Sequence, residues 1–546
     1  MEKLISFVKK YSEAPFALLI FFVVLSGAIY PFLLYIINLA EKNIAIDDNT
    51  FDIRLFAIYL ILLGLLLYSK TFSMNRLIAA SQQIIRKIRV AIIGKIRQTE
   101  LSFVEKIGFG LLYTRLTTDT ETLSRSAPIL IMSMENVFSL IALFFYVMSQ
   151  SFSGFILIIA LLGLSFLVYR SAFASAKQKI RLSRIKEATF FNHLNDVIYG
   201  FKEIRINYQK NEELFTDINL ISQESKELKV DAQDSLNTCF IILNASYFII
   251  IGTIIFIFPI YKVVDNSLII ILVSALLFLW GPVMIIFRSV LQLMLSSVSV
   301  DNLIDLESLL DDFIKDRPDI STRPMSDFNE IKLKSVKYCY TNQQGKSSFE
   351  MGPLDFALRK GEIVFVVGGN GTGKSTFMKI MTGLYFPEKN GKITIDGKIL
   401  TPGAYQSYRE LFSTIFTDFR LFEKLYGLKD VDINKVFNLL KQMQLAHKTQ
   451  YDRGKFTHIE LSSGQKKRLA YVTCLLEDKP IYVFDEWAAD QDPAFRKKFY
   501  ENFLDDMRAM NKTVIAVSHD DRYFDKADRV VKMEDGRFVP YEPSIL

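Results

Sequence analysis

The stretch VVGGNGTGKST, residues 366–376, joins an apolar run to a helical stretch. Its spacing is Gly368, four residues, then Gly373, Lys374 and Ser375. Glycines allow backbone N–H groups to turn inward around an anion, and a helix that begins near Lys374 directs its positive end at the same point. The stretch therefore predicts a phosphate-binding loop, with Lys374 on the β- and γ-phosphates of a nucleotide and the Ser375 hydroxyl on Mg²⁺.

The structural alternative is a chance glycine-rich turn. The apolar strand EIVFVV before the loop and the helical stretch after it favour the phosphate-binding interpretation. The residues expected to surround the nucleotide are Gly368, Gly369, Asn370, Gly371, Thr372, Gly373, Lys374, Ser375 and Thr376.

A second stretch, FDEWAADQDP at 484–493, ends an apolar strand with two adjacent acids. A solvated acidic turn explains this stretch equally well when it is considered alone. Beside a nucleotide site, however, the strand end places Asp485 near Mg²⁺ and Glu486 where it polarises the attacking water. Phosphoryl transfer requires both groups, because the metal neutralises the leaving phosphates while a base lies in line on the other side. Trp487 has no evident chemical role, and we expect it to pack under the loop.

The surrounding sequence changes character after about residue 300. Residues 301–327 are acidic and then interrupted by prolines, which predicts a last helical turn and a linker. From residue 328 to 546, short β-rich runs alternate with helical stretches, so we predict an α/β domain. The β-rich runs are EIVFVV (362–367), KITI (392–395), IYVF (481–484) and TVIAVS (513–518).

Residues 1–300 contain uncharged runs that are long enough to cross a bilayer. They predict an all-α membrane domain of six helices, since a soluble bundle would need several helices with almost no polar face. The expected spans are about 14–40, 55–80, 127–148, 155–175, 237–262 and 267–292.

Basic residues predict the orientation of this domain. The segments 81–126 and 177–238 hold 8 and 10 Lys and Arg residues, whereas the expected outer loops hold three. By the positive-inside rule, both termini and the α/β domain are expected on the cytoplasmic side. The net charge of +6 lies mainly in membrane-proximal loops. We therefore expect membrane lipids as partners of these charges, and no nucleic acid.

Two further motifs complete a recognisable set. LSSGQKKRLA (461–470) follows the phosphate loop by about 90 residues, and His519 follows the strand TVIAVS. With Asp485 and Glu486, these motifs resemble an ATP-binding-cassette domain over residues 328–546. The preceding helices resemble the membrane domain of ABC exporters. The resemblance implies a membrane ATPase that uses ATP and Mg²⁺ to move a substance across a bilayer.

The resemblance also implies roles for single residues. His519 contacts the γ-phosphate beside the catalytic Glu486, and Asp492 links two ATP sites across a dimer interface. Tyr340 stacks on adenine, with Tyr338 as the rival and a core aromatic as the structural alternative. One cassette per chain implies a homodimer with two equivalent sites. The signature residues that bind ATP held by the other protomer are Leu461, Ser462, Ser463, Gly464 and Gln465.

One stretch departs from the family pattern. In FSTIFTDFRLF (412–422) the place of a glutamine that ligates Mg²⁺ and senses the membrane domain is held by Thr417, with Asp418 beside it. Either side chain is an open alternative as a metal ligand. The short stretch from there to the signature implies a reduced helical subdomain.

These departures, with the runs DEWAADQDPAFRKKFY and SHDDRYF, look like the cyclic-peptide export family of bacterial ABC transporters. Its members export lariat antimicrobial peptides and peptide siderophores such as pyoverdine. The resemblance implies export of a cyclic or modified peptide across an inner membrane. The alternatives are a siderophore importer, a lipid or drug exporter on the same frame, and a membrane ATPase that regulates a partner without transporting anything.

Ionisable residues at membrane depth are costly, so Lys70, Arg76 and Glu135 are expected to line a water-filled cavity. Structural pairing, or snorkelling near a helix end, is the alternative. By resemblance, the segments 100–121 and 192–213 each contain a short coupling helix. Together these features imply alternating access, in which ATP binding closes two cassettes and hydrolysis resets them.

Overall fold

The structure is a computed structural model. It describes residues 10–11, 16–46, 52–152, 193–260, 266–314, 325–341, 347–388 and 390–541, with isolated residues between 155 and 190. The chain divides into two compact units. The first combines Met1–Arg89 with Leu116–Leu303, and the second combines Val90–Arg115 with Ile304–Leu546. The second unit therefore includes a short segment that precedes most of the membrane helices in the sequence. The predicted domain boundaries themselves stay predictions.

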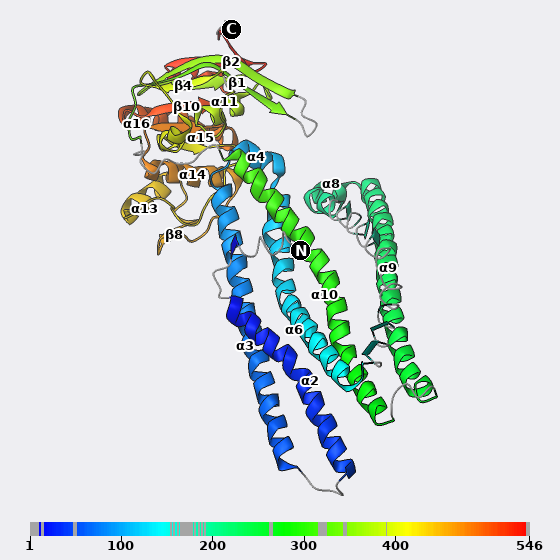
Figure 1. Cartoon of the computed structure of the whole chain (residues 1–546). Coiled ribbons are helices and arrows are strands. Elements are labelled where there is room, and N and C mark those ends of the chain that lie inside the picture. The colour runs from blue at the N-terminus through cyan, green and yellow to red at the C-terminus, as the bar shows by residue number, and fades with distance from the viewer. Residues whose placement is uncertain are drawn as a thin grey trace. The chain divides into compact units, whose positions relative to one another are not determined.

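Long helices dominate the first unit (Figure 1). Five helical segments among the described residues are long and apolar enough to cross a membrane, and each overlaps one of the six predicted spans. The fourth predicted span, 155–175, lies almost wholly outside the described residues. The helices are α2 (Phe16–Ile46), α3 (Ile53–Ile96), α6 (Thr120–Gln150), α9 (Tyr208–Gly252) and α10 (Asn266–Phe313).

Three of these helices run well beyond the spans that hydropathy predicts. Helix α3 continues past residue 80, α9 begins far before residue 237, and α10 continues past residue 292. Hydropathy marks only the part of a helix that faces lipid, whereas the i to i−4 hydrogen bonds continue into water. The first part of the predicted linker, 301–313, is consequently helical, and residues 315–324 lie outside the described part.

Helices α2 and α6 approach closely at Gly27. A Cβ atom at this position would lie 2.5 Å from the backbone oxygen of Glu135 and 2.9 Å from the Cβ of Phe138. Small residues allow such close contact between membrane helices, where lipid provides no hydrophobic driving force for association. Gly27 therefore brings the backbone of α2 against the segment of α6 that carries Glu135.

The α/β domain contains two main sheets. The antiparallel sheet has the order β2-β1-β4-β5, and its strands are β1 (Glu330–Thr341), β2 (Ser347–Arg359), β4 (Lys392–Ile395) and β5 (Lys398–Ile399). The second sheet has the order β12-β11-β3-β10-β9-β6, and all neighbours except β12 are parallel. Its strands are β3 (Ile363–Val367), β6 (Phe412–Ile415), β9 (Ile481–Phe484), β10 (Thr513–Val517), β11 (Arg529–Glu534) and β12 (Arg537–Val539). A short hairpin joins β7 (Tyr451–Asp452) to β8 (Lys455–Phe456).

The parallel sheet is buried on both faces, as continuous apolar strands predict. All five residues of β3 are buried. Val364 and Val366 pack in one hydrophobic cluster, while Ile363, Phe365 and Val367 pack in the other. The helices of this domain are α11 (Lys374–Met381), α12 (Tyr405–Arg409), α13 (Ile433–Gln442), α14 (Ser463–Glu477), α15 (Pro493–Lys498) and α16 (Leu504–Ala509).

This strand order brings the predicted motifs together. The adjacent parallel strands β3, β10, β9 and β6 end at the same edge of the sheet, and open α/β sheets bind ligands at this carboxyl edge. Gly368 follows β3, His519 follows β10 after one residue, Asp485 follows β9, and Thr417 follows β6 after one residue. Motifs far apart in the sequence therefore meet at one end of the sheet.

Candidate functional site

The phosphate-binding loop has the backbone conformation that its glycines permit. Gly368 has φ 148° and Gly373 has φ 106°, values that favour glycine. A Cβ at Gly368 would lie 2.3 Å from the backbone oxygen of Met533, so no larger residue fits there. Gly373 forms the N-cap of α11, whose first turn carries Ser375. Backbone N–H groups at this helix start are available to an anion.

Lys374 is buried within this loop. Its side chain folds back, and Nζ donates to the backbone oxygens of Gly368 at 3.0 Å and Gly369 at 2.8 Å. Burial lowers the pKa of Lys374, and the nearby carboxylates of Glu486 and Asp485 act in the opposite direction. The Lys374 ammonium is therefore in the electrostatic field of both predicted catalytic carboxylates.

Asp485 has the environment of a metal ligand. It is 1% exposed, and both its carboxylate oxygens lack a hydrogen-bond partner among the described residues. Burial raises the pKa of this carboxyl, and the Ser375 hydroxyl acts in the opposite direction. Buried carboxylate oxygens beside a hydroxyl, with no hydrogen bond of regular geometry, suit a divalent cation, so Asp485 and Ser375 fit Mg²⁺. When bound, Mg²⁺ neutralises charge on the nucleotide phosphates.

Glu486 and His519 face each other beside this position. The distance between His519 Nε2 and Glu486 Oε1 is 3.1 Å. Glu486 has φ 52°, a left-handed conformation that is uncommon for a residue other than glycine. Such conformations persist where the surroundings hold them, and they cluster at functional sites. The pair is therefore placed as the predicted roles of base and orienting partner require, and these roles stay predictions.

Residues of the signature helix hold this turn. Lys467, which is 4% exposed, donates from Nζ to the Glu486 backbone oxygen at 2.7 Å and lies 2.8 Å from Asp490 Oδ2. Trp487 donates from Nε1 to the Lys467 backbone oxygen at 2.8 Å. It is 1% exposed, with ring centroids 5.3 Å from Tyr471 and 4.8 Å from Phe499. Packing under the catalytic turn, as expected from the sequence, is therefore its observed position.

Trp487→Ala is expected to destabilise the α/β domain by about 3–5 kcal/mol, because it empties a large buried volume and removes a buried hydrogen bond. This loss corresponds to a fall in Tm of roughly 6–20 °C for a domain of this size. Thermal unfolding of the purified full chain in detergent measures it. Trp280→Ala, which removes the other tryptophan of the sequence, is the matched control, because Trp280 belongs to the first unit. An unchanged melting transition of the α/β domain in Trp487→Ala would contradict the packing role.

The signature motif forms the start of α14. Ser462 is its N-cap and forms a capping box with Gln465, while Ser462 and Ser463 are exposed. Gln491 joins this start to the loop after Glu486: Nε2 donates to the Gly464 backbone oxygen at 3.1 Å, and Oε1 accepts from Arg468 Nε at 2.9 Å. The signature and the loop that follows Glu486 therefore form one connected surface.

Asp492, the predicted link across a dimer, has partners within its own chain. Its Oδ1 accepts from the Phe495 backbone N–H at 2.9 Å and caps α15, and its Oδ2 accepts from Arg468 Nη2 at 2.5 Å. These hydrogen bonds lower the pKa of the Asp492 carboxyl, with the backbone N–H of Phe495 as the main cause. Spacing in the sequence does not predict these partners of Lys467, Arg468 and Gln491.

Tyr340 lies beside the helix that follows the phosphate loop. Its hydroxyl is 3.3 Å from Thr376 Oγ1 and donates to the Tyr385 hydroxyl at 3.2 Å. The rival Tyr338 stacks on the Tyr385 ring, at 4.5 Å between centroids and 9° between planes. Tyr340 is thus the one in contact with the loop helix, and its adenine-binding role stays a prediction.

Thr417 and Asp418 are exposed after β6, beyond Phe416. Asp418 is close enough to Lys379 of α11 to raise the pKa of that ammonium, although the carboxylate of Glu105 is the stronger cause and burial acts against both. Both positions therefore lie near the nucleotide site, and their metal-binding role stays a prediction.

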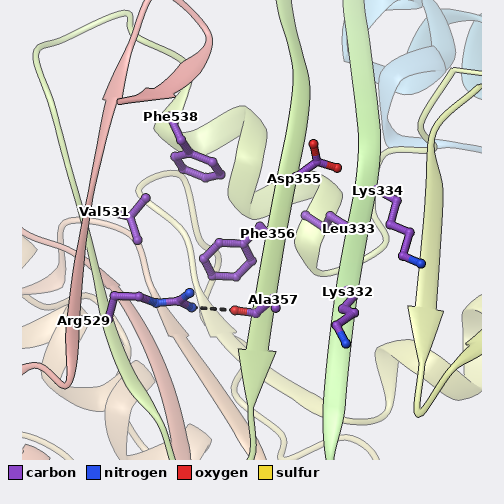
Figure 2. A pocket seen from close by; sticks show the side chains of 9 residues that line it. All are labelled: Lys332, Leu333, Lys334, Asp355, Phe356, Ala357, Arg529, Val531 and Phe538. Atoms are coloured by element: carbon purple, nitrogen blue, oxygen red, sulfur yellow. Dashed lines mark hydrogen bonds between the residues drawn. The ribbon is translucent and has the colours of Figure 1, made fainter. Parts of the chain in front are cut away.

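A separate pocket of about 440 Å³ lies between β1, β2 and the strands β11 and β12 (Figure 2). Arg529 crosses it, with its guanidinium carbon 4.8 Å from the centroid of the Phe356 ring and Nη2 donating to the Ala357 backbone oxygen at 2.5 Å. None of the predicted site residues lines this pocket. It is therefore distinct from the candidate nucleotide site.

Two of the three cavity candidates pair inside the first unit. Lys70 Nζ lies 3.5 Å from Glu135 Oε1 and donates to the Tyr30 hydroxyl at 3.1 Å. Glu135 is 4% exposed, so this acid faces protein and not lipid. Arg76 is exposed, with its guanidinium carbon 5.5 Å from the centroid of the Phe72 ring. Lys70 and Glu135 thus form a polar cluster with Tyr30, which Arg76 does not join through any described contact.

Comparisons with known proteins agree with this fold and site. Residues 16–299 match the family model of the ABC transporter transmembrane region, and residues 351–489 match that of the ABC transporter. The chain is 31% identical over 477 residues to the ATP-binding protein SyrD of Pseudomonas syringae pv. syringae, covering 84% of this chain and 83% of that protein. The chain therefore belongs to the ABC transporter family.

The names of two other relatives refer to different functions. The ATP-dependent lipid A-core flippase of Wigglesworthia glossinidia brevipalpis is 25% identical over 491 residues, covering 84% of this chain and 80% of that protein. The SkfA peptide export ATP-binding protein SkfE of Bacillus subtilis (strain 168) is 28% identical over 221 residues, covering 38% of this chain and 87% of that protein.

A solved structure shares the fold. The structure of a bacterial Atm1-family ABC exporter with ATP bound matches with a TM-score of 0.75 at 15% identity, covering 96% of this chain and 93% of that one. The chain is a multi-pass membrane protein with the ABC exporter fold, a helical transmembrane domain followed by an α/β ATP-binding cassette. It is an ATPase coupled to transport.

Proposed function

We propose that this chain exports a cyclic or otherwise modified peptide across the bacterial inner membrane, as a homodimer whose cassettes and termini lie in the cytoplasm. ATP binding closes the two cassettes and opens the cavity outward, and hydrolysis returns the dimer to its starting state. The observation that carries the proposal is the complete catalytic set at the carboxyl edge of one parallel sheet: Lys374, Asp485, Glu486 and His519.

An intact set argues against a purely regulatory ATPase. Such a protein needs nucleotide binding but no base, whereas here the buried carboxylate of Asp485 lies free for a cation. Glu486 is in addition held in a left-handed turn by a buried lysine, Lys467. A protein that only gated a partner would have no need to retain this conformation.

Exposed groups support a homodimer. Ser462 and Ser463 of the signature are exposed, as a surface that receives nucleotide from a second copy requires. In the first unit, helix α8 (Phe201–Ile206) and its flanks expose large apolar side chains in a cytoplasmic segment that the resemblance assigns to a coupling helix. The exposed residues are Ile198, Tyr199, Phe201, Ile206 and Tyr208, with Ile206 87% exposed. A cassette of the partner is the surface that we expect to cover them.

A peptide cargo is supported by two kinds of observation. The cassette is similar to that of a peptide exporter, SkfE, and the sequence around Trp487 and Thr417 looks like the cyclic-peptide export family. The membrane bundle also holds hydrogen-bonding groups between helices. Lys70 meets Glu135, and Asn38 Nδ2 donates to the Tyr146 hydroxyl at 2.7 Å. Polar groups at membrane depth suit a cargo with amide groups better than one made of acyl chains.

Transport into inside-out membrane vesicles that contain the chain tests the proposal. We expect ATP-dependent accumulation of a fluorescent lariat or cyclic peptide, and no accumulation of a fluorescent lipid A analogue. Vesicles with Glu486→Gln are the matched control, because this chain is expected to bind ATP without turning it over. ATP-dependent movement of the lipid alone would favour a lipid flippase, the alternative that the similarity to a lipid A-core flippase supports.

Two other outcomes would also overturn the proposal. Peptide uptake by right-side-out vesicles, and not by inside-out ones, would indicate an importer. ATP hydrolysis in vesicles that is indifferent to every peptide, with no movement of peptide or lipid, would indicate a regulatory ATPase.

A further inference from the structure

An acidic side chain from outside the α/β fold enters the ATP-binding unit. Helix α4 (Leu101–Ile107) follows membrane helix α3 in the chain and belongs to the same compact unit as the cassette. Its Glu105 places one carboxylate oxygen 2.8 Å from Lys379 Nζ, and the other accepts a hydrogen bond from the Tyr385 hydroxyl. The buried Phe103 of α4 packs on Phe313, at 4.6 Å between ring centroids. The helix is thus held by both apolar and charged contacts.

The contact between Glu105 and Tyr385 leads to the side of the ATP site where we predict adenine to bind. Tyr385 is fully buried, and its hydroxyl accepts from the Tyr340 hydroxyl at 3.2 Å. The Tyr340 hydroxyl in turn lies 3.3 Å from Thr376 Oγ1. An ionised carboxylate only accepts hydrogen bonds, and each hydroxyl donates once. With Glu105 as the final acceptor, the donors therefore run in one direction, from Thr376 through Tyr340 and Tyr385.

The contact between Glu105 and Lys379 leads to the side of the ATP site where we predict the phosphates to bind. Lys379 belongs to α11, the helix that begins at Lys374 of the phosphate loop. Its side chain is 17% exposed, and its ammonium also lies over the Tyr385 ring, 5.2 Å from the centroid. A partly buried, charge-assisted pair holds its geometry better than an exposed one. Glu105 is thus tied at once to the helix of the phosphate loop and to the aromatic residue beside it.

We propose that Glu105 is a positioning residue, through which the segment after membrane helix α3 sets the orientation of Tyr340 and of helix α11, and hence the affinity of the cassette for ATP. The hydrogen-bonded chain through Tyr385 is the connection. It links the segment after α3 to the tyrosine that we predict to stack on adenine. The inference concerns ATP affinity and does not depend on which cargo the transporter moves.

Coupling of this kind is reciprocal. If the docking of α4 changes the affinity for ATP, ATP binding must change the docking of α4 by the same free energy. Hydrogen exchange of residues 101–107 in the purified full chain should therefore slow when ATP is added. The same measurement on Tyr385→Phe should show no such change, because the connection is cut while the ring still stacks on Tyr338. If α4 had only a packing role, its hydrogen exchange would not change when ATP is added.

Kinetics supply the second test. Tyr385→Phe and Glu105→Ala should each raise KM for ATP roughly two- to tenfold, the factor expected for one lost hydrogen bond, with kcat nearly unchanged. The double variant should be no worse than the more affected single variant, because both changes break one chain of contacts. Tyr408→Phe is the matched control: Tyr408 is buried in the same core and donates to the Met381 backbone oxygen, outside the connection.

KM values within twofold of the parent in both single variants would overturn the proposal, as would an equal rise in Tyr408→Phe. Additive effects in the double variant, or ATP-dependent protection of residues 101–107 that persists in Tyr385→Phe, would also overturn it. Failure to transport any peptide while these effects are present would count against the proposed cargo and leave the positioning role standing.

Discussion

Glu486→Gln is expected to lower ATP turnover by roughly 10²–10⁴-fold, the range for loss of a general base, while ATP binding is retained. Glutamine has nearly the same shape as glutamate and keeps a hydrogen-bond acceptor 3.1 Å from His519 Nε2. It cannot take a proton from the attacking water. The backbone turn should survive as well, because Lys467 holds the Glu486 carbonyl oxygen and not its side chain.

The same variant should accumulate as a closed dimer when ATP and Mg²⁺ are present, because hydrolysis is the step that releases the cassettes. Single-turnover kinetics measure the first effect, and cross-linking of the purified chain with and without ATP measures the second. Glu460→Gln is the control, since Glu460 is an exposed acid just before the signature. Turnover within about tenfold of the parent would remove Glu486 from the role of base, because general bases contribute at least 10²-fold.

Lys374→Ala is expected to reduce kcat/KM for ATP by about 10²–10³-fold, the usual effect of removing one donor that stabilises charge in the transition state. The ammonium lies within the phosphate loop, bonded to the backbone oxygens of Gly368 and Gly369. We expect it to exchange these partners for phosphate oxygens when nucleotide binds. Nucleotide binding should weaken along with hydrolysis, in contrast to Glu486→Gln.

A buried lysine also contributes packing, so a second variant is needed. Lys374→Met keeps most of the buried stem and removes only the charge, and it should lose activity as fully as alanine does while unfolding at nearly the parental temperature. Lys398→Ala, at an exposed position in β5, controls for the loss of one positive charge from the cassette. Nucleotide affinity and hydrolysis that are unchanged in both Lys374 variants would refute the phosphate-loop assignment.

Most residues of the candidate nucleotide site lie in motifs that are local in the sequence. The loop from Gly368 to Ser375 and the acids after IYVF are contiguous motifs, and their chemistry follows from spacing alone. The contacts that hold these motifs in place do not follow from spacing. Lys467 reaches Glu486 only because α14 packs beside the turn after β9, and Gln491 joins two motifs that lie 27 residues apart. Residues 466–468 are all basic, and the fold buries one of them, Lys467.

In the membrane domain, the sequence predicts where helices lie better than where they begin and end. Uncharged runs locate the parts of helices that face lipid. Helices α3, α9 and α10 continue among charged residues, where hydropathy does not indicate a helix. Lys70 and Glu135 lie 65 residues apart in the sequence. Expected as neighbours of a cavity, they form an ion pair because α3 and α6 lie within one bundle.

By itself, the sequence determined the class of this protein, a membrane domain joined to a cassette that hydrolyses ATP, because phosphate binding and bilayer crossing each depend on residues that are adjacent in the chain. Only the tertiary structure decided which residues orient that chemistry. The connection from Glu105 to Tyr385 and Tyr340 joins three segments, and no local pattern encodes it. Such contacts depend on how strands and helices pack. Packing brings together residues that are far apart in the sequence, and their spacing does not predict that they meet.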